Sequence, residues 1–212
     1  DYYEPDCPQI KIELDPLKTP QQNAAALYKE YNKLKAAEQH LTGLIAEGER
    51  SLDYLNSVLD ELERAETERD ISDIRRELID TGYLRRAKGG KPERVRAQAP
   101  YRFVTDDGFE VLVGRSNVQN DELTCRLARR TDMWLHTQRV HGSHVIIRCE
   151  GEDVPPRTLE QAASLAAYYS QGRTAGKVPV DYTMVRNVRK PSGALPGKVI
   201  YNEYKTILAE AD

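Results

Sequence analysis

The chain has 212 residues, of which 39% are hydrophobic and 31% are charged, with a formal net charge of -3 at pH 7. This length supports one ordinary hydrophobic core together with a more polar part. No apolar run approaches the roughly 18 to 20 residues of a membrane-spanning helix, so we expect no membrane partner and predict a cytoplasmic protein. Cys7, Cys125 and Cys149 form no CxxC pair, which argues against a disulfide framework and a cysteine-based zinc site.

Charge is distributed unevenly along the chain. Residues 1–82 contain 10 Lys and Arg against 19 Asp and Glu, whereas residues 83–212 contain 21 against 15. Such asymmetry indicates different surroundings for the two parts, and the basic part is the candidate for nucleic-acid binding.

The first 83 residues are predicted to be mainly helical. Residues 1–18 contain a short alternating pattern at 10–14, which predicts a strand without a partner. Residues 19–83 are predicted to form a coiled-coil arm and a short helix. Thr19 is a candidate N-cap for a long helix, and apolar residues then recur at alternating spacings of four and three from Leu27 to Leu62. Because such an apolar seam needs another helix, we expect the chain to self-associate through it.

The arm is followed by a short helix and a linker. A helical pattern from Asp70 to Asp80 ends at Gly82, and it is too short to cover the whole seam. Residues 84–100 are predicted to form a basic linker, because cations are interrupted there by Gly89-Gly90 and Pro92.

Residues 101–212 are predicted to form a compact mixed domain, so the fold class is α+β, with a long helical arm before it. Helices are expected at 117–127 and 158–172. Strands are expected at 101–104, 110–113, 133–137, 144–149, 180–186 and 198–201.

Catalytic chemistry is weakly supported. His136, His141 and His144 lie within nine residues, but their spacing matches no familiar zinc signature, so no metal or other cofactor is expected. Ser143 adjoins His144, yet the second glycine of a GxSxG elbow is missing and neighbours on a strand point to opposite faces. We therefore predict that the protein is not an enzyme, and a metallo-hydrolase or esterase remains the alternative.

RNA binding is better supported. Cations bind phosphate by charge and by forked hydrogen bonds, and aromatic or imidazole rings can stack on unpaired bases. Trp134 is a candidate either for such stacking or for the core. The glycine-containing loops at 172–177 and 190–193 let a phosphate approach the backbone closely. The basic candidates are Arg115, Arg129, Arg139, Arg173, Lys177, Arg189 and Lys190.

Several stretches resemble the NFACT family. DMWLH (132–136), followed by GSHVIIR (142–148), resembles the NFACT-R domain, and residues 188–207 resemble the end of that domain. Residues 14–37 resemble the family's second coiled-coil arm, and 70–83 its short helical segment. The resemblance implies the C-terminal part of a larger protein, with residues 101–212 as an RNA-binding NFACT-R domain. It adds further candidates to the RNA-binding surface: Asp132, Trp134, His136, Gly142, Ser143 and His144. His141, next to this signature, is also a candidate.

The resemblance also implies a function and partners. The family acts in ribosome quality control, where its members bind stalled large ribosomal subunits that carry peptidyl-tRNA. In bacteria they support alanyl-tRNA-dependent C-terminal tailing of the nascent chain. The expected partners are therefore the large ribosomal subunit, rRNA and tRNA. The alternative is a surface adhesin for fibronectin or fibrinogen, or a protein-interaction arm.

Overall fold

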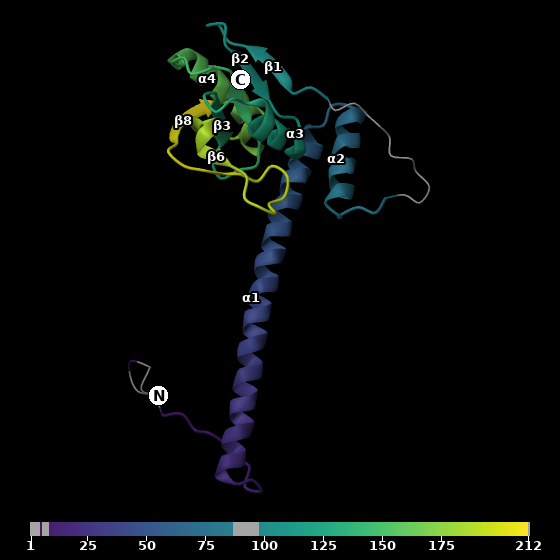
Figure 1. Ribbon diagram of the computed structural model, residues 1–212, viewed down its shortest axis with the longest axis vertical. Coiled ribbons are helices and arrows are strands. Elements are labelled where there is room, and N and C mark those ends of the chain that lie inside the picture. Colours follow the sequence, from purple (N-terminus) through teal and green to yellow (C-terminus); the bar gives the residue numbers. More distant parts are fainter. Residues whose placement is uncertain (1–4, 6–8, 87–97, 212) are drawn as a thin grey trace. The chain divides into compact units, whose positions relative to one another are not determined.

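A computed structural model describes Pro5, residues 9–86 and residues 98–211 (Figure 1). The chain divides into two compact units, Asp1–Ser51 and Leu52–Asp212. Helix α1 (Pro20–Arg64) begins in the first unit and ends in the second. Within the described ranges, none of the helices combines the length and the apolar composition that crossing a bilayer requires.

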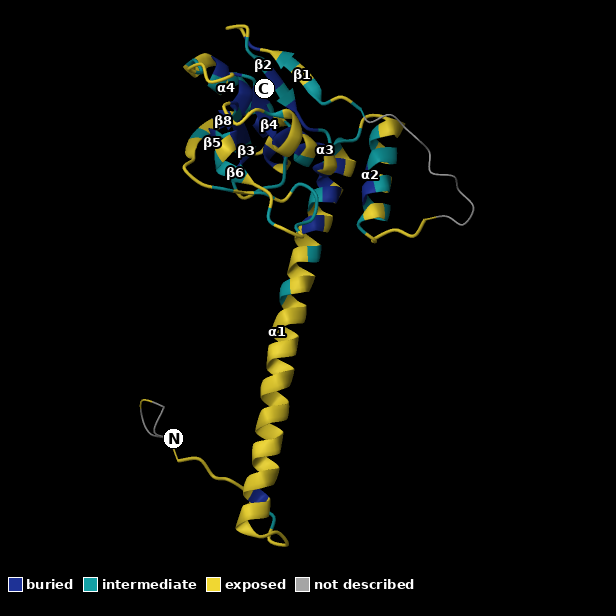
Figure 2. Ribbon diagram, in the orientation of Figure 1, coloured by how far each residue is buried: buried dark blue, intermediate teal, exposed yellow. Residues whose placement is uncertain are grey.

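The start of α1 is capped as the sequence predicts. The Thr19 hydroxyl accepts a hydrogen bond from the Gln22 backbone N–H at 3.2 Å, and the Gln22 side chain accepts one from the Thr19 N–H at 2.9 Å. These reciprocal bonds satisfy donors that would otherwise lack partners at the helix terminus. In the first unit the helix is almost entirely exposed, and so are apolar seam residues such as Leu34 and Ile45 (Figure 2).

The strand predicted at 10–14 is wrong. Residues 9–15 form no strand, and Ile10, Ile12 and Leu14 are each about 60% exposed. An extended segment becomes a strand only when a neighbour completes its hydrogen-bond ladder. Alternation along five residues does not supply that neighbour.

The second unit begins with the end of α1 and with α2 (Glu68–Asp80). Thr67 and Asp70 form a capping box, so α2 begins two residues earlier than predicted. Gly82 follows the helix with φ 87°, the left-handed conformation expected of a glycine there. Tyr54 and Val58 of α1 pack with Ile74 of α2 in a small core. Most of the predicted basic linker, residues 87–97, lies outside the described residues.

The rest of the second unit is built around an antiparallel sheet in the order β1-β2-β4-β3-β5-β8, which confirms the α+β class. A separate hairpin pairs β6 (Val188–Arg189) with β7 (Ile200–Tyr201). The strands of the large sheet are β1 (Tyr101–Val104), β2 (Glu110–Val113), β3 (Met133–Thr137), β4 (Val145–Ile147), β5 (Lys177–Met184) and β8 (Lys205–Glu210).

Both faces of this sheet are covered. Helix α4 (Pro156–Tyr168) packs an alanine-rich face against one side, in the core that contains Leu135. Helix α3 (Asn117–Glu122) continues into a π-helical turn, η1 (Leu123–Leu127), and Leu123 packs on the other side with Trp134. Successive β3 residues therefore enter opposite cores, as strand alternation requires.

Further elements of this unit differ from prediction; strand β5, for example, spans 177–184 rather than 180–186. The helix predicted at 117–127 changes from α to π geometry at Leu123. Helix α4 ends at Tyr168 rather than near Gly172, and a 3-10 turn, η2 (Gln171–Thr174), follows it. Strand β8 was not predicted, because KTILAE alternates only weakly and owes its state to pairing with β5.

Candidate nucleic-acid interface

The connection between β3 and β4 is anchored to the end of α1. The Arg64 guanidinium donates to the Ser143 hydroxyl at 3.1 Å and to Asp60 Oδ2 at 2.6 Å. Ser143 and Asp60 are buried, at 1% and 3% exposure. Burial raises the pKa of Asp60, while the charges of Arg64, His141 and Arg173 lower it. Ser143 thus supports the loop from within, and its hydroxyl is held by a guanidinium rather than by a histidine base.

An aromatic cluster lies on the face of the sheet that η1 covers, and it consists of Trp134, His136 and His144. The Trp134 and His136 rings stack at 5.7 Å, and His144 meets both rings edge-on. Trp134 has no exposed surface, so its place here is in the core. Burial lowers the pKa of His136 to about 4 and that of His144 to about 3. Both imidazoles are therefore neutral at pH 7 and supply no charge for phosphate.

Asp132 is buried and organises two turns. Its carboxylate accepts hydrogen bonds from the Arg129 backbone N–H at 2.8 Å and from the Glu150 N–H at 3.1 Å. The side chain has no exposed surface. Its role in the structure is to hold the arginine-rich turn 129–132 against the turn after β4.

Four of the predicted cations have acidic partners. Arg115 donates to Asp70 at 2.9 Å and lies 4.0 Å from the Tyr101 ring centre. The other pairs are Arg129 with Glu150, Lys177 with Glu210, and Lys190 with Asp121. Of the four, Arg115 has the least exposed side chain, at 18%, so it is the one most engaged within the fold.

The remaining predicted cations are exposed and unpaired. Among residues 98–211, Arg139, Arg173 and Arg189 have no ion pair, and the same holds for Arg126, Arg130, Arg186 and Lys205. Spacing along the chain could not show which cations are unpaired, because pairing depends on acids brought close by the fold.

The structure divides the predicted residues between the two ends of β3. Arg139 and His141 follow this strand, and Arg173 lies in η2, which adjoins them through the backbone bond from the Gln171 N–H to the His141 carbonyl at 2.9 Å. Arg129, by contrast, precedes β3, and Arg189 follows the far end of β5. The predicted set therefore does not form one continuous patch.

At the end of β3 that carries Arg139, two glycines allow the loop after β3 and the η2 turn to pack closely. Gly142 forms an isolated bridge with Ser170, and a Cβ at Gly142 would lie 2.8 Å from the Ser170 Cβ. A Cβ at Gly172 would lie 2.9 Å from a Val178 methyl group. Arg139 has φ 61°, an uncommon backbone conformation for a residue with a side chain. Two tightly packed loops thus carry the unpaired Arg139 and Arg173.

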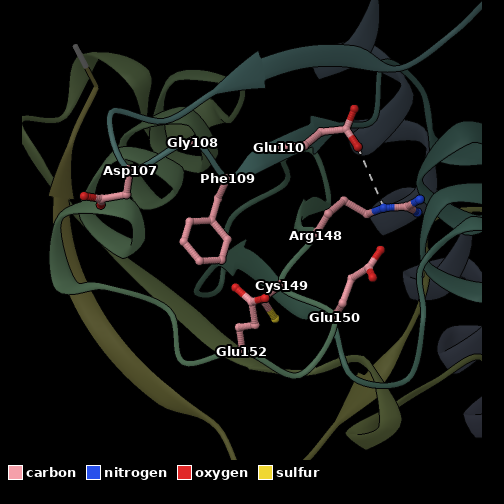
Figure 3. A pocket seen from close by; sticks show the side chains of 8 residues that line it. All are labelled: Asp107, Gly108, Phe109, Glu110, Arg148, Cys149, Glu150 and Glu152. Atoms are coloured by element: carbon pink, nitrogen blue, oxygen red, sulfur yellow. Dashed lines mark ion pairs between the residues drawn. The ribbon is translucent and has the colours of Figure 1, made fainter.

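A pocket of about 390 Å³ lies elsewhere, between the β1–β2 turn and the end of β4 (Figure 3). It contains four acids against one arginine, Arg148, which pairs with Glu110. None of the predicted RNA-binding residues lines it, and its negative charge disfavours phosphate. Nor do the described parts of the chain contain three or more His, Cys, Asp or Glu side chains arranged to hold a metal.

Two family models match the chain. Residues 99–202 match the NFACT protein RNA binding domain, and residues 1–96 match the NFACT N-terminal and middle domains. Together with the arm and the mixed domain, these matches define a protein class in which a long helix precedes an RNA-binding domain. The chain belongs to the NFACT family.

Individual relatives agree with this assignment. The chain is 39% identical to the Rqc2 homolog RqcH of Bacillus subtilis, over all of this chain and 37% of the relative. It is 42% identical to RqcH of Streptococcus suis, over 94% of this chain and 36% of the relative. The chain thus spans just over a third of the length of these relatives.

A solved structure is also similar: the C-terminal of the fibronectin/fibrinogen-binding protein from Streptococcus suis. It has a TM-score of 0.84 and 39% sequence identity, and the match covers 93% of this chain and 78% of that one.

Proposed function

We propose that this chain is the RNA-binding part of a cytoplasmic, non-enzymatic ribosome quality-control factor. In this role it binds stalled large ribosomal subunits carrying peptidyl-tRNA, through rRNA and tRNA, and supports alanyl-tRNA-dependent tailing of the nascent chain. The family models and the RqcH relatives support this role. The adhesin alternative is not favoured, because these curated relatives are named as Rqc2 homologues.

The observation that carries RNA binding is the exposed, unpaired pair Arg139 and Arg173 on two closely packed loops. A guanidinium offers a planar set of donors that matches phosphate oxygens, and an internal carboxylate would compete for it. Neither arginine forms an ion pair with a carboxylate among the described residues, although the charge of Arg173 reaches the buried Asp60.

Binding of a tRNA transcript to the 212-residue chain, measured by filter retention at several salt concentrations, tests the proposal. Affinity should fall steeply with salt, because phosphate contacts release condensed counterions. The double variant Arg139→Gln/Arg173→Gln should bind more weakly and with a shallower salt dependence. As the matched control, Arg102→Gln/Arg157→Gln removes two exposed cations that are paired with Glu110 and Asp106. An absence of binding, or binding independent of salt, would contradict the proposed function.

Self-association through the α1 seam is a separate proposal. Leu34, Leu41 and Ile45 are between 55% and 62% exposed, and together they form part of an apolar stripe. Light scattering should show a dimer that dissociates on Leu34→Glu/Leu41→Glu substitution. Glu30→Gln/Glu47→Gln, at exposed polar positions of the same helix, is the control. A monomer at high protein concentration would rule the proposal out.

A further inference from the structure

A second group of unpaired cations lies at the other end of β3 from Arg139. We call it the arginine cluster. It consists of Arg126, Arg130, Arg186 and Arg189, all of them exposed. Within the described part of the domain, no acidic side chain forms an ion pair with any of the four. Four uncompensated guanidinium groups on nearby segments repel one another, and an anionic ligand would relieve that repulsion.

The backbone holds the segments of the cluster together. The Arg186 N–H donates to the Arg130 carbonyl at 3.2 Å, and the Val185 N–H donates to the Asp132 carbonyl at 2.9 Å. Arg189 follows in β6, which pairs with β7. Met133 at the start of β3 pairs with Met184 at the end of β5, so the turn before β3 lies beside the turn after β5, and each contributes arginines to the same end of the sheet.

The turn before β3 is also fixed from inside. The buried Asp132 carboxylate binds the Arg129 and Glu150 backbone N–H groups, as described above. Arg130 lies inside the loop that the first of these bonds closes. The cluster thus stands on an ordered backbone, which lowers the entropy cost of binding a ligand.

The nearest acids leave an excess of positive charge. Glu150 pairs with Arg129, and Asp121 pairs with Lys190. Glu203 lies close through its backbone, whose carbonyl accepts a hydrogen bond from the Thr183 hydroxyl at 3.1 Å. Glu122 is exposed four positions before Arg126. Even if Glu203 and Glu122 each offset one arginine, two positive charges remain, and this excess fits a ligand that carries several phosphates.

We propose that the arginine cluster is a second phosphate-binding surface, which contacts an RNA backbone segment separate from the one at Arg139 and Arg173. About six residues of extended chain, from Asp132 to Gln138, separate the two ends, or roughly 20 Å at about 3.3 Å per residue. One phosphate cannot reach both ends. The domain then contacts RNA at two points, and this inference rests on the proposed RNA-binding function.

The test compares three double variants of the 212-residue chain in the same salt titration with a tRNA transcript. They are Arg130→Gln/Arg186→Gln, the Arg139→Gln/Arg173→Gln pair and the Arg102→Gln/Arg157→Gln control. The slope of log affinity against log salt should become shallower by about 1.5 for Arg130→Gln/Arg186→Gln, because each phosphate contact contributes roughly 0.7 to 0.9. The control slope should change little. Thermal melts check that each variant is folded.

The outcomes distinguish the proposed RNA-binding function from the second phosphate-binding surface. If the unmodified chain does not bind, both the proposed function and the second surface fail. If it binds and Arg130→Gln/Arg186→Gln behaves like the control, the second surface alone is overturned. If both test pairs make the salt slope shallower, a quadruple variant that combines them should change the slope by the sum of the two changes, because sites this far apart act independently. A quadruple variant no worse than either pair would contradict two separate contacts.

Discussion

Glu61 is a buried carboxylate that the fold leaves without a hydrogen-bond partner. Its side chain is 3% exposed, and neither of its oxygens has a partner in good hydrogen-bond geometry among the described residues, although the Asn117 backbone lies near enough to lower its pKa. The nearby Glu77, also buried, accepts hydrogen bonds from Tyr54 at 2.8 Å and Asn117 at 3.3 Å. Burial and the Glu77 charge raise the pKa of Glu61 well above its ordinary value, and Arg64 opposes this only in part.

Replacing Glu61 with Gln should stabilise the second unit. The amide has nearly the same shape and no charge, so the substitution removes the desolvation cost and the repulsion from Glu77. The Gln amide is also polar and buried without a partner, so the gain comes only from the lost charge, and we expect it to be about 1 kcal/mol. A gain of that size raises the midpoint of thermal unfolding by roughly 2 to 4 °C for a unit of this length.

The gain should depend on pH in a defined direction. Because the pKa of Glu61 is raised by folding, the folded state binds more protons than the unfolded state above the ordinary pKa of about 4.5. Stability from this group is thus fully present below pH 4.5 and is lost as pH rises towards the folded pKa. The difference between variant and unmodified chain should be small at pH 4.5 and should grow towards pH 8.

Urea unfolding at a series of pH values, followed by circular dichroism, measures this difference. Glu63→Gln is the matched control, since Glu63 lies two residues away on the same helix and is exposed. The control should change stability by less than about 0.5 kcal/mol at every pH. The reasoning would be refuted if Glu61→Gln destabilised the unit at pH 8, or if its effect were the same at all pH values.

Three further predictions concern the core of the proposed RNA-binding domain. Arg64→Met should cost about 3 kcal/mol of unfolding free energy in urea titrations, because it leaves Asp60 buried without its cation and removes the bond to Ser143; a neutral effect would contradict the anchoring role. His144 has a pKa of about 3 in the fold, so below pH 6.5 the unfolded state binds more protons and the free energy of unfolding falls on acidification. His144→Asn should remove about 3 kcal/mol of this loss between pH 6.5 and 4. An unchanged dependence of stability on pH would refute this prediction. Trp134→Ala should cost about 3 to 5 kcal/mol, whereas Trp134→Phe should leave tRNA affinity intact, since the ring is buried; a loss of affinity in folded Trp134→Phe would indicate direct stacking instead.

The helical and sheet elements with strong local signals were predictable. The capping residues Thr19 and Gln22 and the apolar spacing that follows them predicted α1 from residue 20, and β3 was predicted with its observed bounds at 133–137. Helix caps and periodicity depend on residues two to four positions apart, which a sequence displays directly. The family resemblance, carried by short motifs in a consistent order, is confirmed by the two family models.

The candidate site was only partly predictable. Whether an arginine can bind a ligand depends on whether an acid lies beside it, and Arg115 meets Asp70 across 45 positions of the chain. Arg130 and Arg186 come together through a backbone bond between segments 56 positions apart. The resemblance added Asp132, Ser143 and His144 to the surface, but the fold buries all three.

A long helix with an apolar seam, a basic mixed domain after it and membership of a family are all readable from the sequence. Each of these follows from local pattern, composition or motif. Long-range contacts decide three further features: Trp134 and the histidines beside it pack in a core, four of the seven predicted cations are paired with acids, and the unpaired arginines lie at the two ends of β3. The physical reason is that burial and ion pairing are set by contacts between residues far apart in the chain, which no local pattern records.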